Sequence, residues 1–302
     1  FRPGRSPHQA LNALNEALIK RKTNWVLDAD VRRFFDSVDH EWLLRLVAHR
    51  IADRRILRLI RQWLRAGVLE GGKWFKTVEG TPQGAGISPL LANIFLHYSL
   101  DLWVHQWRQR HDKGDVIIVR YCDDFVMGFE SQADAKSMLG ELKGRLSKFG
   151  LGLHEKKTRL LEFGRYAAER RRRRGMRRPE TFDFLGFTHY CSMNKKGNFF
   201  IMRKTQGARM MRKLKELRIE ARRRMHQQLK KQQRWLSAVL RGHYAYYGLL
   251  GNSRALSSFA YEVHKLWFRA LRRRSQKNAM TWERFNRLLK LFPLPTPRLF
   301  RT

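Results

Sequence analysis

Hydrophobic and polar positions change their spacing along the chain, and the change predicts two domains. Up to about Phe163, short apolar runs typical of strands alternate with apolar stripes typical of helices, which predicts an α+β fold. From Thr205 onward, the apolar positions recur at helical spacing among many basic residues, which predicts an all-α fold. We therefore expect domains at 1–204 and 205–302, the first with an arginine-rich insert at 164–180.

In the first domain, residues 116–129 predict a hairpin with two aspartates at its turn. β-Branched and aromatic residues lie on both sides of Asp123 and Asp124, and nothing between them favours a helix. Two adjacent aspartates are also common in turns, where their side chains cap backbone groups. For the pair taken alone, this structural explanation stays open.

Two further aspartates, Asp28 and Asp30, favour chemistry at the pair. Residues 25–27 are typical of a buried strand that ends in these aspartates, and strand alternation places both on one face. Carboxylates that lie close together repel unless a cation separates them, and a divalent metal is the simplest candidate. Two-metal nucleotidyl transfer needs carboxylates from separate strands around cations about 3.5–4 Å apart. One strand end and one hairpin can supply that cluster.

Two helices of the first domain are marked by their first residues. Asp39 can cap one helix. Ser88 and Pro89, which follow the glycine-rich residues 80–86, start another. The apolar stripe of this second helix, which we assign to the core, consists of Leu90, Leu91, Ile94, Phe95, Tyr98 and Leu102.

The insert at 164–180 is expected to be an exposed loop. It contains the consecutive residues Arg170, Arg171, Arg172, Arg173 and Arg174. Such a run cannot pack against itself, so either phosphates of a nucleic acid order it or it remains a solvated flexible insert. After the insert, residues 181–190 alternate like a strand, and 194–198 form a turn into a second strand, which predicts a hairpin.

Composition indicates a polyanionic partner. The chain of 302 residues has 63 Lys and Arg against 26 Asp and Glu, a formal charge of +37 that exceeds what solubility requires. Cys122 and Cys191 form no metal-binding pattern or disulfide scaffold, and no signal peptide or transmembrane run is visible, so we expect a cytoplasmic protein without a membrane partner. Ribosomal and histone-like proteins share such basicity, so charge alone does not indicate an enzyme.

The helical domain mixes aromatic and cationic residues in a way that suits RNA. Aromatic rings stack on bases while cations bind phosphates. The candidate RNA contacts are Arg241, Tyr244, Tyr247, Lys265 and Arg272. The alternative, a helical bundle whose aromatics form its core, is the simpler interpretation for most of the rings.

Several sequence blocks, in order, resemble those of the reverse transcriptases encoded by bacterial group II introns. They are residues 1–8, 30–36, 80–93, 121–124, 151–158, 184–187 and 241–248 with the segment up to Trp282. The first of them is similar to that family's second block, and the last to its maturase (X) domain. The resemblance implies a right-hand polymerase palm with partial fingers, followed by an all-α thumb or maturase domain. Single blocks are weakly specific, but this many in order are very specific.

The resemblance also assigns roles to single residues. Asp30, Asp123 and Asp124 match the carboxylates that bind two Mg²⁺ ions, with the Val31 carbonyl as a further ligand, and Asp28 is left with a structural or supporting role.

Three more residues match positions around the nucleotide. Phe35 falls where the family keeps a bulky residue that excludes a ribose 2′-hydroxyl, and Gln83 falls near the nucleotide. Lys157 matches a lysine that protonates the leaving pyrophosphate, the alternative being an ordinary basic surface residue.

The implied function is RNA-directed DNA synthesis together with intron RNA binding and splicing. Its partners would be group II intron RNA, an RNA template with a DNA primer, deoxynucleoside triphosphates and a DNA target. The main alternative is a non-catalytic RNA-binding maturase that keeps the palm as a scaffold. A generic basic ribosomal or chromatin protein gives no reason for the three carboxylates.

The chain departs from the family pattern in three places. It opens inside the second block, so we expect the fingers residues that clamp the triphosphate to be absent. It has no cysteine-rich, His-Asn-His-like tail, so we expect no DNA endonuclease. Glu155 also replaces the proline usual in the Lys157 block, which does not touch the chemistry.

Overall fold

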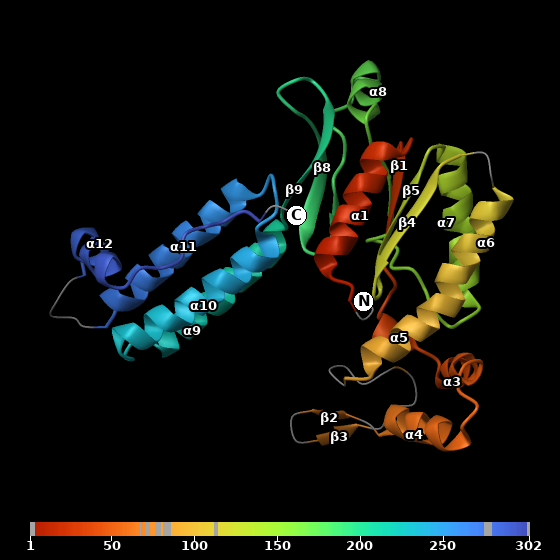
Figure 1. The fold of residues 1–302 in the computed structure, drawn as a ribbon, viewed down its shortest axis with the longest axis horizontal. Coiled ribbons are helices and arrows are strands. Elements are labelled where there is room, and N and C mark those ends of the chain that lie inside the picture. Colours follow the sequence, from red (N-terminus) through yellow and green to blue (C-terminus); the bar gives the residue numbers. More distant parts are fainter. Residues whose placement is uncertain are drawn as a thin grey trace. The chain divides into compact units, whose positions relative to one another are not determined.

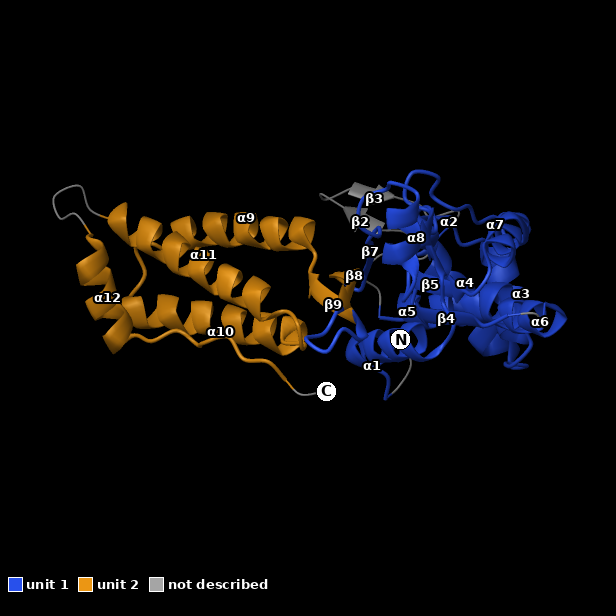
Figure 2. Cartoon of the chain, turned by 90° about the horizontal axis from the view of Figure 1, so that it is seen from above, with its two compact units in different colours: residues 1–185, 193–200 blue, residues 186–192, 201–302 orange. Residues whose placement is uncertain are grey.

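The structure is a computed structural model that describes residues 4–66, 68–70, 73–75, 80, 86–111, 114–274 and 280–300. The chain forms two compact units (Figure 2). One consists of residues 1–185 and 193–200, and the other of 186–192 and 201–302. The expected α+β fold with a helical C-terminal part is confirmed, although the second unit also includes strand residues before 205.

An antiparallel sheet lies at the centre of the first unit (Figure 1). Its strand order is β4-β5-β1-β6. The strands are β1 (Trp25–Ala29), β4 (Val116–Tyr121), β5 (Asp124–Phe129) and β6 (Arg159–Glu162). Because β1 pairs with β5 on one side and β6 on the other, Val26 and Leu27 are both buried, as expected for an apolar run in a central strand.

Helices surround this sheet, and α7 packs on β1 and β5. The helices and the remaining hairpin of the unit are α1 (Pro7–Lys20), α2 (Phe34–Ser37), α3 (His40–Ala48), α4 (Arg54–Arg65), β2 (Val68–Glu70), β3 (Lys73–Phe75), α5 (Ser88–Leu96), the π-helical η1 (His97–Asp101), α6 (Leu102–Arg110), α7 (Gln132–Ser147) and α8 (Ala167–Arg173). The predicted cap of α3 is confirmed, since the Asp39 carboxylate accepts a hydrogen bond of 2.7 Å from the Trp42 amide.

Helices α5 and α6 are one continuous helix interrupted by η1, and the interruption moves the buried face. The start predicted at Ser88 and Pro89 is confirmed. Phe95 and Leu102 are seven residues apart and would share a face in an α-helix. The wider π turn instead brings Leu100 into the core and leaves Leu102 exposed. The prediction of a core stripe is therefore wrong for Leu102, and also for Leu90, which is exposed.

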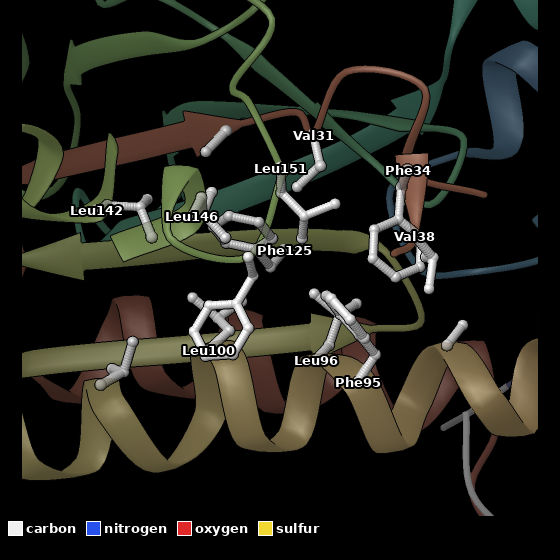
Figure 3. Packing of buried hydrophobic residues seen from close by; sticks show 14 of the residues in the cluster. Val31, Phe34, Val38, Phe95, Leu96, Leu100, Phe125, Leu142, Leu146 and Leu151 are labelled. Carbon is white, nitrogen blue, oxygen red and sulfur yellow. The ribbon is translucent and has the colours of Figure 1, made fainter. Parts of the chain in front are cut away.

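The core of the first unit lies where this long helix meets the sheet and α7 (Figure 3). The side chains that Figure 3 labels are Val31, Phe34, Val38, Phe95, Leu96, Leu100, Phe125, Leu142, Leu146 and Leu151. They come from segments that are far apart in the sequence. Val31 follows Asp30 and Phe125 follows Asp124, so packing of this core also fixes the backbone beside the aspartates.

A second sheet has the strand order β7-β8-β9. Its strands are β7 (Phe182–Phe184), β8 (Phe187–Met193) and β9 (Phe199–Thr205). The single strand predicted over 181–190 is wrong, because Leu185 and Gly186 have φ values of 47° and 79° and break it in two. The predicted turn is confirmed: the Asn194 side chain accepts hydrogen bonds of 2.9 Å from the amides of Lys196 and Asn198.

The arginine run is not the exposed loop that its sequence predicts, because Arg170 to Arg173 lie in helix α8 and Arg174 is the C-cap of that helix. Arg170 and Arg174 both form ion pairs with the carboxylate of Glu162, whose side chain is buried. Arg171 lies 3.6 Å from the Glu180 carboxylate. Carboxylates of the first unit therefore pair with part of the run, and contact between the run and RNA stays a prediction.

The second unit is a helical bundle, as predicted. Its helices are α9 (Gly207–Arg223), α10 (Leu229–Tyr247), α11 (Ser253–Arg272) and α12 (Trp282–Leu291). Leu217, Leu240, Phe259 and Trp267 are buried in its core, and the Trp267 indole donates a hydrogen bond of 3.0 Å to Gln232. Across the described segments, no helix has both the length and the apolar character needed to cross a bilayer.

Two tyrosines proposed to contact RNA belong to this bundle. Tyr244 is 3% exposed, its hydroxyl lies 3.3 Å from the Pro295 carbonyl, and burial raises its pKa to about 12. The predicted base stacking is therefore wrong for Tyr244, because a core ring offers no free face. Tyr247 is half-buried, and its ring packs 5.1 Å from that of Phe187.

His243 makes the stability of the bundle sensitive to pH. Its ring stacks on Phe259 with centroids 3.6 Å apart, and burial, followed by the charge of Lys213, lowers its pKa from 6.5 to about 4. Because the folded-state pKa lies below the unfolded value, the stability present above pH 6.5 is lost as the pH falls through 4. Because solvent screens part of this effect, we expect the free energy of unfolding to fall by about 1–2 kcal/mol.

His243→Phe keeps the ring stack but cannot bind the proton. Urea unfolding at pH 7 and pH 4 should therefore show that this variant loses less free energy of unfolding on acidification than the wild type does. The expected difference is about 1–2 kcal/mol. His226→Phe, at an exposed histidine of the same unit, is the control and should follow the wild type. Identical pH dependence of His243→Phe and wild type would contradict the assignment.

Candidate active site

The adjacent aspartates lie at the turn of the β4–β5 hairpin, as the sequence predicts. Tyr121 pairs with Asp124 at the end of the ladder, so Cys122 and Asp123 form the two-residue turn. Cys122 has a φ of 59°, in the left-handed region that is costly for a residue with a side chain. Burial raises the pKa of its thiol to about 11, so this sulfur stays protonated at neutral pH.

Strand register brings the third carboxylate to the same end of the sheet. Ala29, the last residue of β1, is paired with Phe125, the residue after Asp124. Asp30 therefore leaves the sheet directly beside the hairpin turn. The sequence prediction of a strand end next to a hairpin is confirmed in this respect.

Lys157 is held against the same strand end by backbone hydrogen bonds. The His154 amide donates to the Asp30 carbonyl at 2.8 Å, and Val31 forms an isolated bridge with Leu153. These contacts place the Lys157 ammonium 2.7 Å from a carboxylate oxygen of Asp30. Two blocks more than a hundred residues apart thus meet at a single ion pair.

Asp28 lies two residues before Asp30, and its carboxylate pairs with a different cation. Its carboxylate lies 3.2 Å from the Arg159 guanidinium. Burial raises its pKa to about 6, although Arg159 opposes the shift. A half-buried carboxylate with its own cation fits the structural role expected for Asp28.

The carboxylates suit a hard divalent cation in chemistry and backbone position. Asp30, Asp123 and Asp124 offer only oxygen donors, the type that Mg²⁺ prefers. Asp30 meanwhile interacts with the Lys157 ammonium, which supplies positive charge beside this carboxylate. Over the described part of the chain, no three acidic, histidine or cysteine side chains are gathered closely enough to hold a metal ion. A bound cation would have to compete with Lys157 for the Asp30 carboxylate.

Phe35 and the start of the glycine-rich block meet close by. Phe35 is half-buried, with its ring edge-to-face against Phe34 at 5.4 Å. Gly80 has a φ of 87°, and a Cβ there would lie 2.6 Å from the Phe35 carbonyl oxygen, so only glycine fits. The Gly80 amide also donates to the Val38 carbonyl at 2.9 Å. Gln83 lies outside the described residues.

Arg120 is a site residue that the sequence prediction missed. Its side chain is 8% exposed and donates to both carboxylate oxygens of Asp101, at 2.7 and 2.5 Å. The same guanidinium donates to Asn93 at 3.0 Å and to the carbonyl of Cys122, inside the turn, at 2.8 Å. One cation therefore ties the hairpin turn to the long helix. A charged residue within the apolar run 116–121 was the available signal.

Arg145 of α7 supports the partner of Arg120 from the other side. The π turn η1 frees helix carbonyls, and Arg145 donates to those of Ser99 and Tyr98 at 2.9 and 3.0 Å. The irregular turn that contains Asp101 is thereby stabilised.

Backbone strain coincides with the blocks that the sequence singled out. In the described segments, the non-glycine residues with positive φ are Arg33, Cys122 and Leu185. Each belongs to a different block, the first two beside the aspartates. Such strain persists only where surrounding contacts enforce it, and it concentrates at functional sites.

A cavity of about 640 Å³ lies on the Tyr121 side of the hairpin. Leu90 and Pro89 line it, which accounts for the exposure of Leu90. Arg50 also lines it and donates to the Tyr98 hydroxyl at 3.3 Å. The cavity therefore combines mainly apolar walls with the cations Arg5 and Arg50.

The remaining candidate RNA contacts lie in the second unit. Arg241 of α10 and Arg272 of α11 are exposed. Lys265 of α11 is paired with Glu262 at 3.1 Å and lies over the Tyr261 ring. Of these cations, Arg241 and Arg272 are the ones that no carboxylate of the described residues neutralises.

The family described as reverse transcriptase (RNA-dependent DNA polymerase) matches residues 1–189. The chain belongs to the reverse transcriptase family. The match includes both aspartate-bearing segments, Asp30 and the Asp123–Asp124 pair, and confirms the resemblance drawn from the sequence blocks.

Similar proteins cover parts of the chain. The group II intron-encoded protein LtrA of Lactococcus lactis subsp. cremoris is 42% identical over 116 residues, which are 37% of this chain and 18% of that protein. Protein YkfC of Escherichia coli K12 is 31% identical over 194 residues, 53% of this chain and 50% of that protein. This reverse transcriptase chain thus matches half or less of the length of either relative. A solved structure of apo telomerase from Candida tropicalis aligns with 94% of this chain and with 51% of the telomerase chain. The two are 12% identical in sequence, and the TM-score is 0.47.

We expect Arg120→Met to destabilise the first unit by about 3–5 kcal/mol, because it leaves Asp101 without its buried partner. Asp101→Leu in the same chain should recover part of the loss, with a coupling energy of about 1–3 kcal/mol in urea unfolding. Arg108→Met, at an exposed arginine of α6, is the control and should cost less than about 0.5 kcal/mol. Strict additivity of the Arg120 and Asp101 variants would contradict the proposed link.

Proposed function

We propose that this chain catalyses RNA-directed DNA synthesis as part of a group II intron reverse transcriptase. The observation that carries the proposal is the register of β1 against β5, which brings Asp30 beside the Asp123–Asp124 turn in a chain of this family. The similarity to an intron-encoded protein supports the intron as the origin of the RNA.

In this proposal Asp30, Asp123 and Asp124 hold the divalent ions that reverse transcriptases use, with Mg²⁺ as the ion and the Val31 carbonyl as a further ligand. Bound there, the ions would activate the primer 3′-hydroxyl and stabilise the leaving pyrophosphate. Arg120 fixes the turn that carries two of the three carboxylates, so it acts as a positioning residue.

Lys157 would donate the proton that the leaving pyrophosphate requires. Its ion pair with Asp30 supports this role, because it holds the ammonium at the strand end that carries one of the three carboxylates. A divalent cation held by the Asp30 carboxylate would compete with the Lys157 ammonium for that carboxylate, which would leave Lys157 available to the pyrophosphate. Phe35 would lie under the incoming sugar and Gln83 near the nucleotide.

The partners in this proposal are polyanions, as the charge of +37 requires. The first unit would act as the palm with partial fingers, and residues from 205 onward as the thumb or maturase domain. The template is RNA, the primer is DNA, and the substrates are deoxynucleoside triphosphates. The thumb would also bind group II intron RNA to assist its splicing and to bring the complex to a DNA target, in the cytoplasm.

Primer extension on an RNA template with Mg²⁺ tests the carboxylate assignment. The Asp123→Ala, Asp124→Ala double variant should lose extension by on the order of a thousandfold, because the reaction loses ligands for its divalent ions. Glu16→Ala with Glu41→Ala removes two exposed carboxylates elsewhere in the first unit and should extend like the wild type.

Equal extension by the aspartate variant and the wild type would refute the assignment. Tight RNA binding by a wild-type chain that extends no primer would favour the alternative, a non-catalytic maturase that keeps the palm as a scaffold.

Phe35→Ala should lower the selectivity for deoxynucleotides over ribonucleotides by about tenfold or more, because steric exclusion of the 2′-hydroxyl is lost. Phe35→Tyr keeps the ring and is the matched control. Incorporation of each nucleotide class on the same primer gives the ratio. A ratio that is unchanged in Phe35→Ala would remove Phe35 from the sugar site.

A further inference from the structure

The C-terminal turns of α9 and α11 lie side by side and enclose a cavity of about 440 Å³. Its walls carry the arginines Arg218, Arg222, Arg269, Arg272 and Arg273. Its floor consists of Leu266 and two small buried residues, Ala221 and Ala270. Figure 2 shows both helices within the second unit. Guanidinium groups from two helices thus face one shared space.

No carboxylate of the described residues pairs with these five arginines, all of which are exposed. The nearby acidic residue of α9 is already engaged, since Glu220 interacts with Arg224 at 2.6 Å and with Arg223 at 3.8 Å. The arginine run at 170–174 shows the contrast, because Arg170 and Arg174 share the buried Glu162. The cavity therefore retains its full positive charge.

Helix dipoles account for only part of this charge. Each helix C-terminus carries roughly half a negative elementary charge, so two adjacent ends are balanced by about one cation. About four positive charges remain in excess. Arg218 and Arg222, like Arg269 and Arg273, are also four residues apart on one helix, where like charges destabilise it. An excess of cations that the helices do not need indicates an anionic ligand.

We propose that this cavity binds neighbouring phosphates of a nucleic-acid backbone. The planar guanidinium fork matches phosphate oxygens in two-point hydrogen bonding, and two facing rows of arginines can hold more than one phosphate. Because Ala221 and Ala270 keep the floor low, the backbone can approach the helices closely. The inference rests on the nucleic-acid partner of the proposed function and is independent of its polymerase chemistry.

Fluorescence anisotropy of labelled RNA and DNA hairpins of one sequence tests this site in the full chain, without nucleotides. The cavity variant carries Gln at the five arginine positions. Its matched control carries Gln at five exposed cations of the same unit that line no part of the cavity, Arg212, Lys215, Lys230, Lys231 and Arg234. Relative to that control, the cavity variant should bind at least tenfold more weakly near 0.2 M salt, with a salt-dependence slope lower by about 2–4.

The hairpin that loses affinity identifies which nucleic acid the cavity takes. Equal affinity and slope for the cavity variant and the control, on both hairpins, would overturn the proposal. Thermal unfolding should show the cavity variant at least as stable as the wild type, because repulsion between like charges is removed. A second variant carries Lys at the five positions. Its salt-dependence slope should stay within about 1 of the wild-type slope, while its affinity for the hairpins should still fall below that of the wild type.

The binding result is separate from the test of polymerase function. A chain that extends no primer still gives a readable comparison of the two five-residue variants. A chain that extends primers, with both variants binding alike, would refute the cavity and leave the polymerase assignment intact.

Discussion

The geometry of the candidate site depends on the hydrogen bonds and the ion pair that the Arg120 guanidinium forms. This guanidinium is buried, it forms a two-point ion pair with Asp101, and it donates to the carbonyl of Cys122 in the turn beside the aspartates. A buried cation is tolerated only where its donors are satisfied, so the turn and the π-helical segment must keep their relative positions. The strained φ of Cys122 is held by the same contacts.

Charge compensation divides the cations of this chain into two groups. Some are neutralised within the fold, as Arg174 is by Glu162 and Lys157 by Asp30. Others have no carboxylate partner among the described residues, as at the C-terminal turns of α9 and α11. The first group stabilises local structure, whereas the second is available to a polyanion. Net charge therefore indicates the class of partner, and only the pairing shows where it can bind.

Local patterns predicted much of the fold and the backbone of the site. β-Branched runs marked the β4–β5 hairpin, a capping aspartate marked α3, a Ser-Pro start marked α5, and helical spacing marked the bundle. The failures came from features that residue type and regular spacing do not encode. Glu162 pairs with Arg170 and Arg174 of a run predicted to be a loop, and a π turn moves Leu102 out of the core. The sequence predicted that Tyr244 could stack on a base, but neighbouring side chains of the bundle bury its ring.

The sequence by itself determined the family, the two strand ends that carry aspartates, and the polyanionic character of the partner, because each depends on residue type and local spacing. The tertiary structure alone decided that Lys157 pairs with Asp30, that Arg120 ties the turn to a helix, and that arginines of two helices share one cavity. These pairings join residues far apart in the chain. Local periodicity contains no information about which distant side chains meet, since packing of the whole core sets those distances.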